Sequence, residues 1–141
     1  MIQVKDVVKS FDGNVVLNHV SANFEDGKVN MIIGQSGSGK TVLMKSMIGL
    51  HQIDGGEIVF DTRAGQQNLA GMTEKEVRML HREVGMLFQG SALFDSMTVQ
   101  ENVMFPLEMF SDMTDEEKVA RARFCLERVN MPERAFGLMP S

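Results

Sequence analysis

An eight-residue loop pattern constrains the fold of this 141-residue chain more than any other feature. Residues Gly34–Thr41 read Gly-Gln-Ser-Gly-Ser-Gly-Lys-Thr and match the phosphate-binding pattern G-x-x-x-x-G-K-[ST]. Polyphosphate crowds negative charge into a small volume, and glycine lets backbone N–H groups approach it closely. A helix that begins near Lys40 directs the positive end of its dipole at the same anion. We therefore expect Lys40 to reach the β- and γ-phosphates and the Thr41 hydroxyl to hold Mg²⁺.

The segments on both sides of this loop predict the strand–loop–helix setting that the pattern requires. Residues 29–33 form an apolar run that predicts a buried strand leading into the loop. Residues 42–48 have the apolar spacing of a helix, and Gly49 can end that helix. A flexible Gly/Ser linker is not flanked in this way, so the pattern indicates a folded phosphate site.

Composition limits the classes of protein to which the chain can belong. Apolar content of 43% and charged content of 23% are ordinary for one soluble globular domain. The net charge of −5 argues against a nucleic-acid partner, because neutralising phosphates requires a basic surface. Cys125 is the only cysteine, so no internal disulfide can form. The first residues lack the apolar core of a signal peptide, and no apolar run approaches transmembrane length.

The remaining sequence predicts strands in the first half and helices in the second. Strands are expected over residues 2–7, 15–17, 20–24, 57–60 and 84–88. Turns are expected at residues 11–14, 26–27 (as a tight hairpin) and 54–56, and a polar loop at 63–70. Capping boxes at residues 73–76, 98–101 and 114–117 predict helix starts, the first helix running to about His81 and the last to about Asn130.

Gln89 is a second candidate site residue, because it follows the predicted strand 84–88. A glutamine there can ligate Mg²⁺ through its amide oxygen or orient the attacking water, and so respond to the γ-phosphate. By contrast, His19, His51 and His81 are scattered and lack metal-ligand spacing, which predicts surface or packing roles for them.

The order and spacing of these motifs resemble the ATP-binding cassette (ABC) transporter ATPases over nearly the whole chain. The similarity lies in Phe11, the strand around Val16, the Gly34–Thr41 loop, the strand Gly55–Asp61 and the segment Val84–Gln89. It implies that ATP and Mg²⁺ are the cofactors, that Phe11 stacks on adenine and that Val16 flanks the same base. The implied phosphate-binding residues are Gly34, Gln35, Ser36, Gly37, Ser38, Gly39, Lys40 and Thr41. Lys40 and Gln89 are the implied catalytic residues, and Thr41 and Gln89 the implied metal ligands.

A narrower resemblance links the segment after Gln89 to the ATPase subunit of Mla-type, MCE-associated phospholipid transporters. The matching residues are Gly90–Val99, Glu101–Val103, Phe105–Leu107 and the closing Leu138–Ser141. The resemblance implies a parent protein that drives transport of a lipid-like substrate through an integral-membrane permease. That permease would dock on the surface after Gln89. The parent would be a homodimer in the cytoplasm, held on the inner face of the membrane by the permease.

The same resemblance implies an α/β fold with a P-loop NTPase core, an N-terminal antiparallel β-subdomain and the start of a helical subdomain. Residues 1–89 would form the core portion and residues 90–141 part of the helical subdomain. No segment of the chain matches the family's signature sequence, Walker B Asp, catalytic Glu or switch His. The segment Ile58–Asp61 could be mistaken for Walker B, but Thr62 follows it where that motif needs Glu. We therefore expect a truncated cassette that contains about 60% of a complete ABC ATPase domain. Such a fragment would bind nucleotide weakly and would not turn over ATP by itself.

Two other function classes remain as alternatives. A different P-loop NTPase is one, but the N-K-x-D and D-x-x-G motifs of a GTPase do not occur. A nucleotide kinase needs an arginine-bearing lid, which Arg78, Arg82, Arg121 and Arg123 could supply only loosely. An ABC-type ATPase of DNA repair or translation is the other. Repair relatives insert a long coiled coil after the glutamine, which this chain lacks, and the net charge disfavours the basic insertions of translation relatives.

Overall fold

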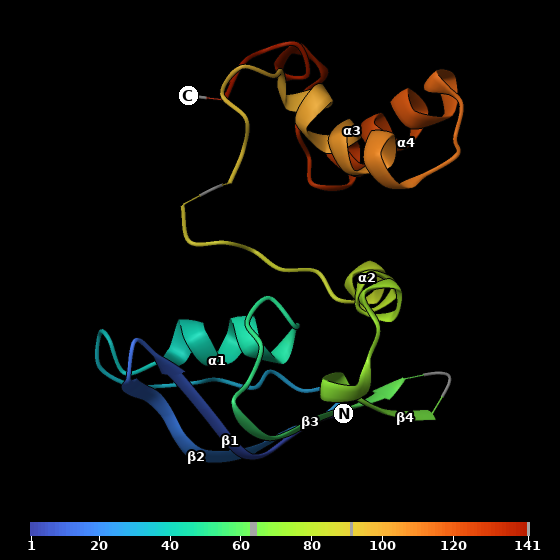
Figure 1. The fold of residues 1–141 in the computed structure, drawn as a ribbon. Helices are drawn as coiled ribbons and strands as arrows, with labels where there is room; N and C mark the ends of the chain where they lie inside the picture. Colours follow the sequence, from blue (N-terminus) through green and yellow to red (C-terminus); the bar gives the residue numbers. More distant parts are fainter. Residues whose placement is uncertain (63–64, 91, 141) are drawn as a thin grey trace. The chain divides into compact units, whose positions relative to one another are not determined.

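The computed structural model describes residues 1–62, 65–90 and 92–140, and the chain divides into two compact units, Met1–Met86 and Leu87–Ser141. The first unit is a sheet with helices on one face, and the second is helical (Figure 1). Four residues of the sequence-based expectations lie outside the described residues: Arg63, Ala64, Ser91 and Ser141.

The sheet of the first unit has four strands in the order β2-β1-β3-β4, and all neighbours are antiparallel. The strands are β1 (Ile2–Phe11), β2 (Asn14–Phe24), β3 (Gly55–Thr62) and β4 (Gly65–Asn68). The predicted α/β fold with an N-terminal antiparallel β-subdomain is thereby confirmed.

A tight hairpin joins β1 to β2 at the predicted turn. Asp12 and Gly13 have φ angles of 48° and 81°, and positive φ at both central residues matches the twist of the flanking strands. The two predicted strand pieces at 15–17 and 20–24 are one strand. The pairing register shifts between Val7 and Lys9 of β1, and His19 opposite has a φ of 52°. The polar break in the sequence is therefore a bulge within the strand.

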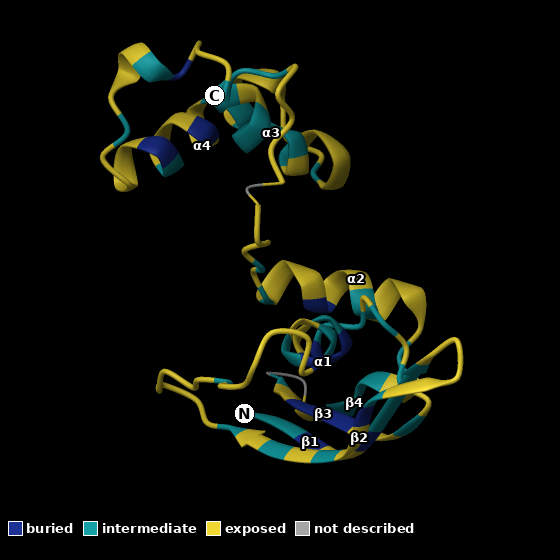
Figure 2. Cartoon of the chain, turned by 90° about the vertical axis from the view of Figure 1, so that its left-hand side faces the viewer, coloured by how far each residue is buried: buried dark blue, intermediate teal, exposed yellow. Residues whose placement is uncertain are grey.

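The core of the first unit lies between the sheet and two helices, α1 (Lys40–Met47) and α2 (Glu74–Glu83). Both helices lie over the same face of the sheet, and the buried positions face one another across that layer (Figure 2). Gly49, with a φ of 75°, follows α1 as predicted. The buried cluster consists of Val4, Val7, Leu17, Leu43, Met47, Ile58, Phe60 and Leu80.

The predicted polar loop at 63–70 is wrong from Gly65 onwards. β4 pairs with β3 from Thr62↔Gly65 to Val59↔Asn68, and the 3₁₀ helix η1 (Leu69–Gly71) follows. Ladder hydrogen bonds come from the backbone, so a polar segment can add to the edge of a sheet without an apolar pattern. The predicted turn at 54–56 is also shorter, because Gly55 and Gly56 already belong to β3.

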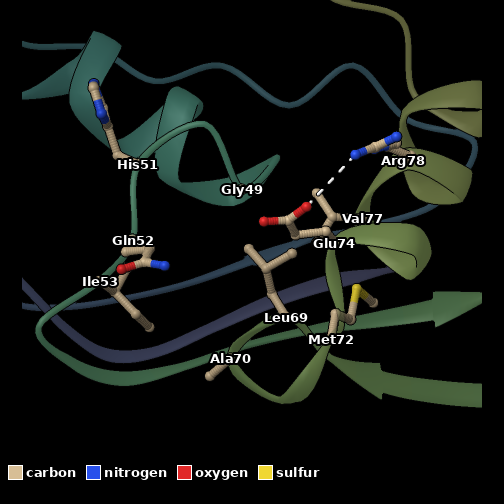
Figure 3. A pocket seen from close by; sticks show the side chains of 10 residues that line it. All are labelled: Gly49, His51, Gln52, Ile53, Leu69, Ala70, Met72, Glu74, Val77 and Arg78. Carbon is tan, nitrogen blue, oxygen red and sulfur yellow. Dashed lines mark ion pairs between the residues drawn. The ribbon is translucent and has the colours of Figure 1, made fainter.

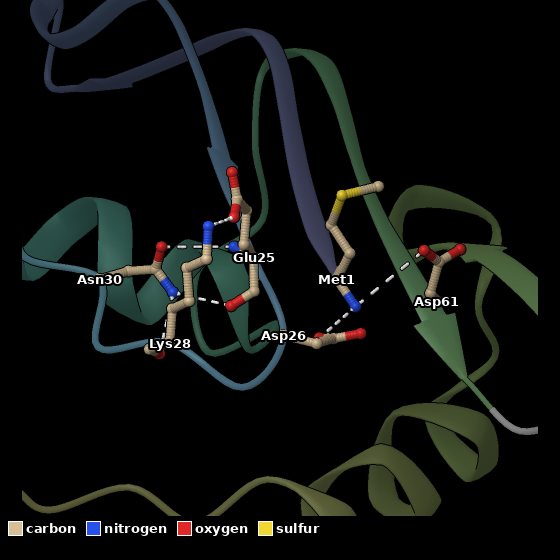
Figure 4. Close-up of polar contacts among 6 residues, drawn as sticks. All are labelled: Met1, Glu25, Asp26, Lys28, Asn30 and Asp61. Atoms are coloured by element: carbon tan, nitrogen blue, oxygen red, sulfur yellow. Dashed lines mark hydrogen bonds and ion pairs between the residues drawn. The ribbon is translucent and has the colours of Figure 1, made fainter.

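Polar contacts order the segment that leads from β2 toward the phosphate loop (Figure 4). The Asn30 side chain accepts from Glu25 N at 3.3 Å and donates to Glu25 O at 3.0 Å, and Lys28 forms an ion pair with Glu25. The amino group of Met1 pairs with Asp26. The turn predicted at 26–27 is present, but the hairpin is wrong, because the chain does not return as a strand.

The strands predicted at 29–33 and 84–88 are wrong in this structure. Val29, Met31 and Ile33 are 95%, 76% and 85% exposed, and Leu87 is 90% exposed. No strand of the described residues pairs with either segment. A strand exists only where a neighbouring backbone satisfies its N–H and C=O groups, and an apolar run supplies no such neighbour by itself.

All three predicted capping boxes are present. They begin α2 at Thr73, α3 (Val99–Phe110) at Thr98 and α4 (Asp115–Arg128) at Thr114. In each box the threonine hydroxyl accepts from the backbone N–H three residues on, and the glutamate there accepts from the threonine N–H. The predicted ends are each two residues off, since α2 reaches Glu83 and α4 stops at Arg128. Within the described ranges, none of these helices is long and apolar enough to cross a bilayer.

The capping boxes make the helix starts sensitive to acid. The pKa values of Glu76 and Glu101 lie below the ordinary 4.5, because the backbone N–H and then the hydroxyl of the capping threonine donate to each carboxylate. A folded-state pKa below the unfolded one stabilises the fold above about pH 4.5, and this contribution is lost as the pH falls through the folded pKa. We expect the double variant Glu76→Gln/Glu101→Gln, which keeps an acceptor that does not titrate, to lose less helix signal in circular dichroism below that pH. Superimposable acid titrations would contradict this role.

In the second unit, the Asn102 side chain of α3 forms hydrogen bonds with the loop that precedes its own helix. Its Oδ1 accepts from Phe94 N at 2.8 Å, and its Nδ2 lies within 2.9–3.1 Å of the carbonyls of Phe94, Met97 and Thr98. The rings of Phe94 and Phe105 pack with centroids 4.8 Å apart. One amide side chain therefore fixes the segment that follows Gln89 within this unit.

We expect Asn102→Asp to destabilise the second unit by about 1–2 kcal/mol, because it removes both donors and sets a carboxylate against three carbonyls. Hydrogen exchange at the Phe94 amide, which keeps its acceptor, measures the loosening of the loop. Gln100→Glu is the matched control, since it adds the same charge two residues earlier, and among the described residues the Gln100 side chain reaches only the Met104 sulfur, at 3.9 Å. Equal exchange in both variants would rule out the role of Asn102.

Candidate functional site

The loop that carries the phosphate-binding pattern is folded against β2. Gly37 and Gly39 have φ angles of 79° and 90°, which is the left-handed region that favours glycine. A Cβ on Gly39 would lie 3.0 Å from the carbonyl oxygen of Val16 and 3.2 Å from the Leu17 side chain. Gly39 is therefore required both by its backbone angles and by its close approach to the strand.

The N-terminus of α1 differs from those of the other α-helices in how its backbone is satisfied. Its capping position is Gly39, no side chain accepts a hydrogen bond from its first turn, and that turn has no acidic residue. The first N–H groups of a helix have no partner within the helix, and the dipole makes this end positive. The start of α1 therefore offers backbone donors to an external anion.

Lys40 extends over the same loop. Its Nζ donates to the carbonyl oxygens of Gly34 at 2.8 Å and Gln35 at 2.6 Å, and the Ser38 N–H also donates to Gln35 O at 3.2 Å. An ammonium has three N–H donors, so these two bonds leave one for a phosphate oxygen. The positive charge is thus held beside the helix start, where an anion would bind.

A hollow of about 160 Å³ lies at this point. Its lining residues are Val16, Gly37, Gly39, Lys40, Thr41 and Val42. The volume is below the roughly 300–1,000 Å³ of sites that enclose a small molecule, so it suits the phosphates of a nucleotide better than the whole molecule. Thr41 is exposed beside the hollow, where a hydroxyl could complete a Mg²⁺ shell made mostly of phosphate oxygens and water.

The structure brings together only part of the predicted site. Val16 joins the phosphate loop in lining the hollow, whereas Gln35, Ser36 and Ser38 belong to the exposed turn of that loop. Phe11, at the end of β1, is 38% exposed and does not line the hollow. Gln89 is exposed in the second unit, and its roles as metal ligand and catalytic residue stay predictions.

Phe11 has neighbours that sequence reasoning missed. His51 packs against its ring at 5.4 Å between centroids with an interplanar angle of 76°, and Lys9 Nζ lies over the ring at 5.1 Å from its centroid. The spacing of Lys9 and Phe11 along a strand could have indicated a shared face, since alternate residues point the same way. No sequence signal could have placed His51 there, because it comes from the loop after α1.

A larger hollow of about 560 Å³ lies elsewhere in the first unit, between the loop after α1, η1 and the start of α2 (Figure 3). Leu69 and Val77 meet beneath Gly49, and Glu74 pairs with Arg78 at 3.5 Å on its rim. No residue of the phosphate loop lines this hollow. Its size alone therefore does not make it the nucleotide site.

Comparison with known proteins connects this geometry to one family. The profile of the ABC transporter family matches residues 17–138. The methionine import ATP-binding protein MetN of Rhizobium johnstonii is 33% identical over 96% of this chain and 36% of its own length. The phosphonates import ATP-binding protein PhnC of Fusobacterium nucleatum is 31% identical over 96% of this chain and 56% of its own. The glutamine transport ATP-binding protein GlnQ of Escherichia coli is 35% identical over 96% of this chain and 54% of its own length.

Solved structures agree with this result. The chain superimposes on the ATP-binding cassette MJ0796, in a dimeric post-hydrolysis state bound to ADP and phosphate, with a TM-score of 0.83 and 28% identity. The match covers 99% of this chain and 62% of the cassette, so the chain spans about a third to three fifths of the proteins it resembles. The family match removes the GTPase and nucleotide kinase alternatives. The chain belongs to the ABC transporter family of ATP-binding proteins.

Proposed function

We propose that this chain is the nucleotide-binding part of the ATP-binding subunit of an ABC transporter. The observation that carries the proposal is the start of α1, where uncommitted backbone donors, a glycine that admits no side chain and the Lys40 ammonium surround one hollow. Such a site suits a polyphosphate because it supplies positive charge and N–H groups without a competing carboxylate.

Each part of the site has a distinct task in this proposal. The backbone of the Gly34–Gly39 loop cradles the phosphates of ATP, and Lys40 neutralises charge on the β- and γ-phosphates. Thr41 ligates Mg²⁺, which offsets phosphate charge when bound. The proposal that Gln89 is also a metal ligand rests on its place in the sequence alone. Phe11, which does not line the hollow, stacks on the adenine, and Val16, which does line it, flanks the base, so the base extends from the hollow toward Phe11.

The parent protein would use ATP binding and hydrolysis to drive transport through an integral-membrane permease. Two copies would act as a homodimer at the inner face of the membrane, and the permease would dock on the surface after Gln89. Leu93 and Phe94 are 55% and 45% exposed there, while Asn102 holds the loop that carries them. A fixed, partly apolar surface suits a partner helix better than a mobile one does.

The substrate class is the most specific part of the proposal. We propose a lipid-like substrate on the basis of the segments Gly90–Val99 and Phe105–Leu107, which resemble phospholipid-transport ATPases. The relatives named above are for methionine, phosphonates and glutamine, and their names support transport without supporting a lipid. The substrate assay therefore has to include both classes.

The test is reconstitution of the parent protein with its permease in proteoliposomes. We expect Mg²⁺-dependent ATP hydrolysis that the permease stimulates, and ATP-dependent movement of a fluorescent phospholipid but not of radiolabelled methionine or glutamine. Lys40→Met in the parent should abolish both activities while the complex still assembles. Amino-acid transport would overturn the lipid substrate alone, whereas Mg²⁺·ATP turnover that is insensitive to Lys40→Met would overturn the proposed site.

A further inference from the structure

The Phe11 ring is held in place by side chains from two separate parts of the first unit. Lys9 Nζ lies over the ring at 5.1 Å from its centroid. The His51 imidazole packs nearly perpendicular to it, with centroids 5.4 Å apart. Phe11 nevertheless stays 38% exposed and lies outside the buried cluster beneath α1. An aromatic ring that is fixed but not buried suits a contact surface better than a core position.

Asp54 holds Lys9 in its position over the ring. Lys9 Nζ donates to Asp54 Oδ1 at 3.0 Å, and the Ser10 N–H donates to Asp54 Oδ2 at 2.6 Å. The Asp54 N–H in turn donates to Val8 O at 2.8 Å, so the turn before β3 is fastened to the end of β1. The Lys9 side chain is only 13% exposed. The bond from Ser10 N–H, followed by the bond from Lys9, lowers the pKa of Asp54 below its ordinary 3.8 and keeps the carboxylate charged.

We propose that Lys9, His51 and Asp54 are positioning residues for nucleotide-base binding, which fix the Phe11 ring before the base arrives. The proposal rests on the proposed function, in which Phe11 stacks on the adenine of ATP. A free phenylalanine at a strand end samples several rotamers, and stacking must then immobilise it at an entropic cost. Lys9 and His51 restrict the ring in advance, so more of the stacking energy contributes to affinity.

This arrangement predicts that the three positioning residues affect binding of the nucleotide base but not binding of the phosphates. The three positioning residues contact Phe11 or one another, and none of them lines the hollow at Lys40 and Thr41. A ligand with phosphates and no base should therefore bind independently of them. A merely structural role in holding β1 to β3 would instead alter both kinds of ligand together.

The experiment compares the affinity of the chain for ATP and for inorganic tripolyphosphate, each with Mg²⁺, by calorimetric titration. Phe11→Ala should lower ATP affinity about tenfold, the scale of one aromatic–base contact, and leave tripolyphosphate affinity unchanged. Lys9→Met and His51→Ala should each lower ATP affinity about threefold to tenfold, again without an effect on tripolyphosphate. Asp54→Asn, which keeps an acceptor for the Ser10 N–H, should lower ATP affinity as much as Lys9→Met does. Lys9→Arg, which keeps the positive charge, should retain the ATP affinity of the unmodified chain. Lys75→Met, at an exposed position of α2, is the control.

The outcomes separate this proposal from the one on which it depends. If Phe11→Ala is selective for ATP while Lys9→Met and His51→Ala change nothing, base stacking stands and the positioning role is overturned. If the positioning variants weaken both ligands equally, their role is structural and the proposal is also overturned. If Phe11→Ala affects neither ligand or both equally, base stacking itself fails and this proposal fails with it, while tripolyphosphate binding still tests the phosphate site.

Discussion

Lys40→Met should weaken binding of Mg²⁺·ATP by about 10- to 150-fold, because a hydrogen bond to a charged group contributes about 1.5–3 kcal/mol. The methionine keeps most of the aliphatic stem but removes the ammonium that lies beside Gly34 and Gln35. The backbone donors at the start of α1 remain, so some binding should persist. Competition titration with a fluorescent ATP analogue measures the change.

The matched control for this variant is Lys45→Met, in the last turn of the same helix. It removes the same charge from α1, but at the end opposite the loop. Its ATP affinity should stay within about twofold of the unmodified chain, since Lys45 lies five residues farther along α1 and salt screens a charge that does not contact the phosphates. Equal losses in the two variants would mean that net charge, and not the position of Lys40, determines binding.

Gly39→Ala should destabilise the first unit by about 2–4 kcal/mol and abolish detectable nucleotide binding. A residue with a side chain at a φ of 90° is strained, and its Cβ would meet Val16 and Leu17 at 3.0–3.2 Å. Relief of this contact must move the loop or β2, which displaces the donors that face the phosphates. The chain has no Trp or Tyr, so urea unfolding is best followed by circular dichroism, with hydrogen exchange of β3 reporting on this unit.

Gly37→Ala separates the two causes of this effect. Its φ of 79° is also in the left-handed region, but nothing lies within 4 Å of the Cβ it would gain. It should therefore cost only the backbone strain, about 1–2 kcal/mol. If Gly37→Ala is as damaging as Gly39→Ala, then close packing of the loop on β2 is not what makes Gly39 necessary.

Local signals in the sequence were sufficient for the parts of the fold that local chemistry determines. The capping boxes at Thr73, Thr98 and Thr114 predicted three helix starts correctly, because each box satisfies its own backbone groups within four residues. The Asp12–Gly13 turn was predictable for the same reason. The phosphate loop was recognisable because its glycines and Lys40 act through backbone geometry that the pattern itself specifies.

The errors arose where a partner distant in sequence decides the structure. Residues 29–33 and 84–88 have the composition of strands, but the described residues pair no strand with them. β4 is polar and became a strand because the edge of β3 was available. The contacts of Asp54 and His51 with the end of β1 depend on how β3 and the loop before it lie against that strand. No single-sequence pattern specifies such contacts.

Equilibrium binding of ATP, ADP and AMP, each with and without Mg²⁺, tests the central claim most directly. If the loop, the α1 start and Lys40 form a polyphosphate site, affinity should fall from ATP to ADP and be lost for AMP. Inorganic tripolyphosphate should then compete with ATP, and Lys40→Met should reduce the preference for the triphosphate. AMP binding as tight as ATP, with no competition from tripolyphosphate, would contradict the account, because recognition would then depend on the nucleoside and not on the phosphates.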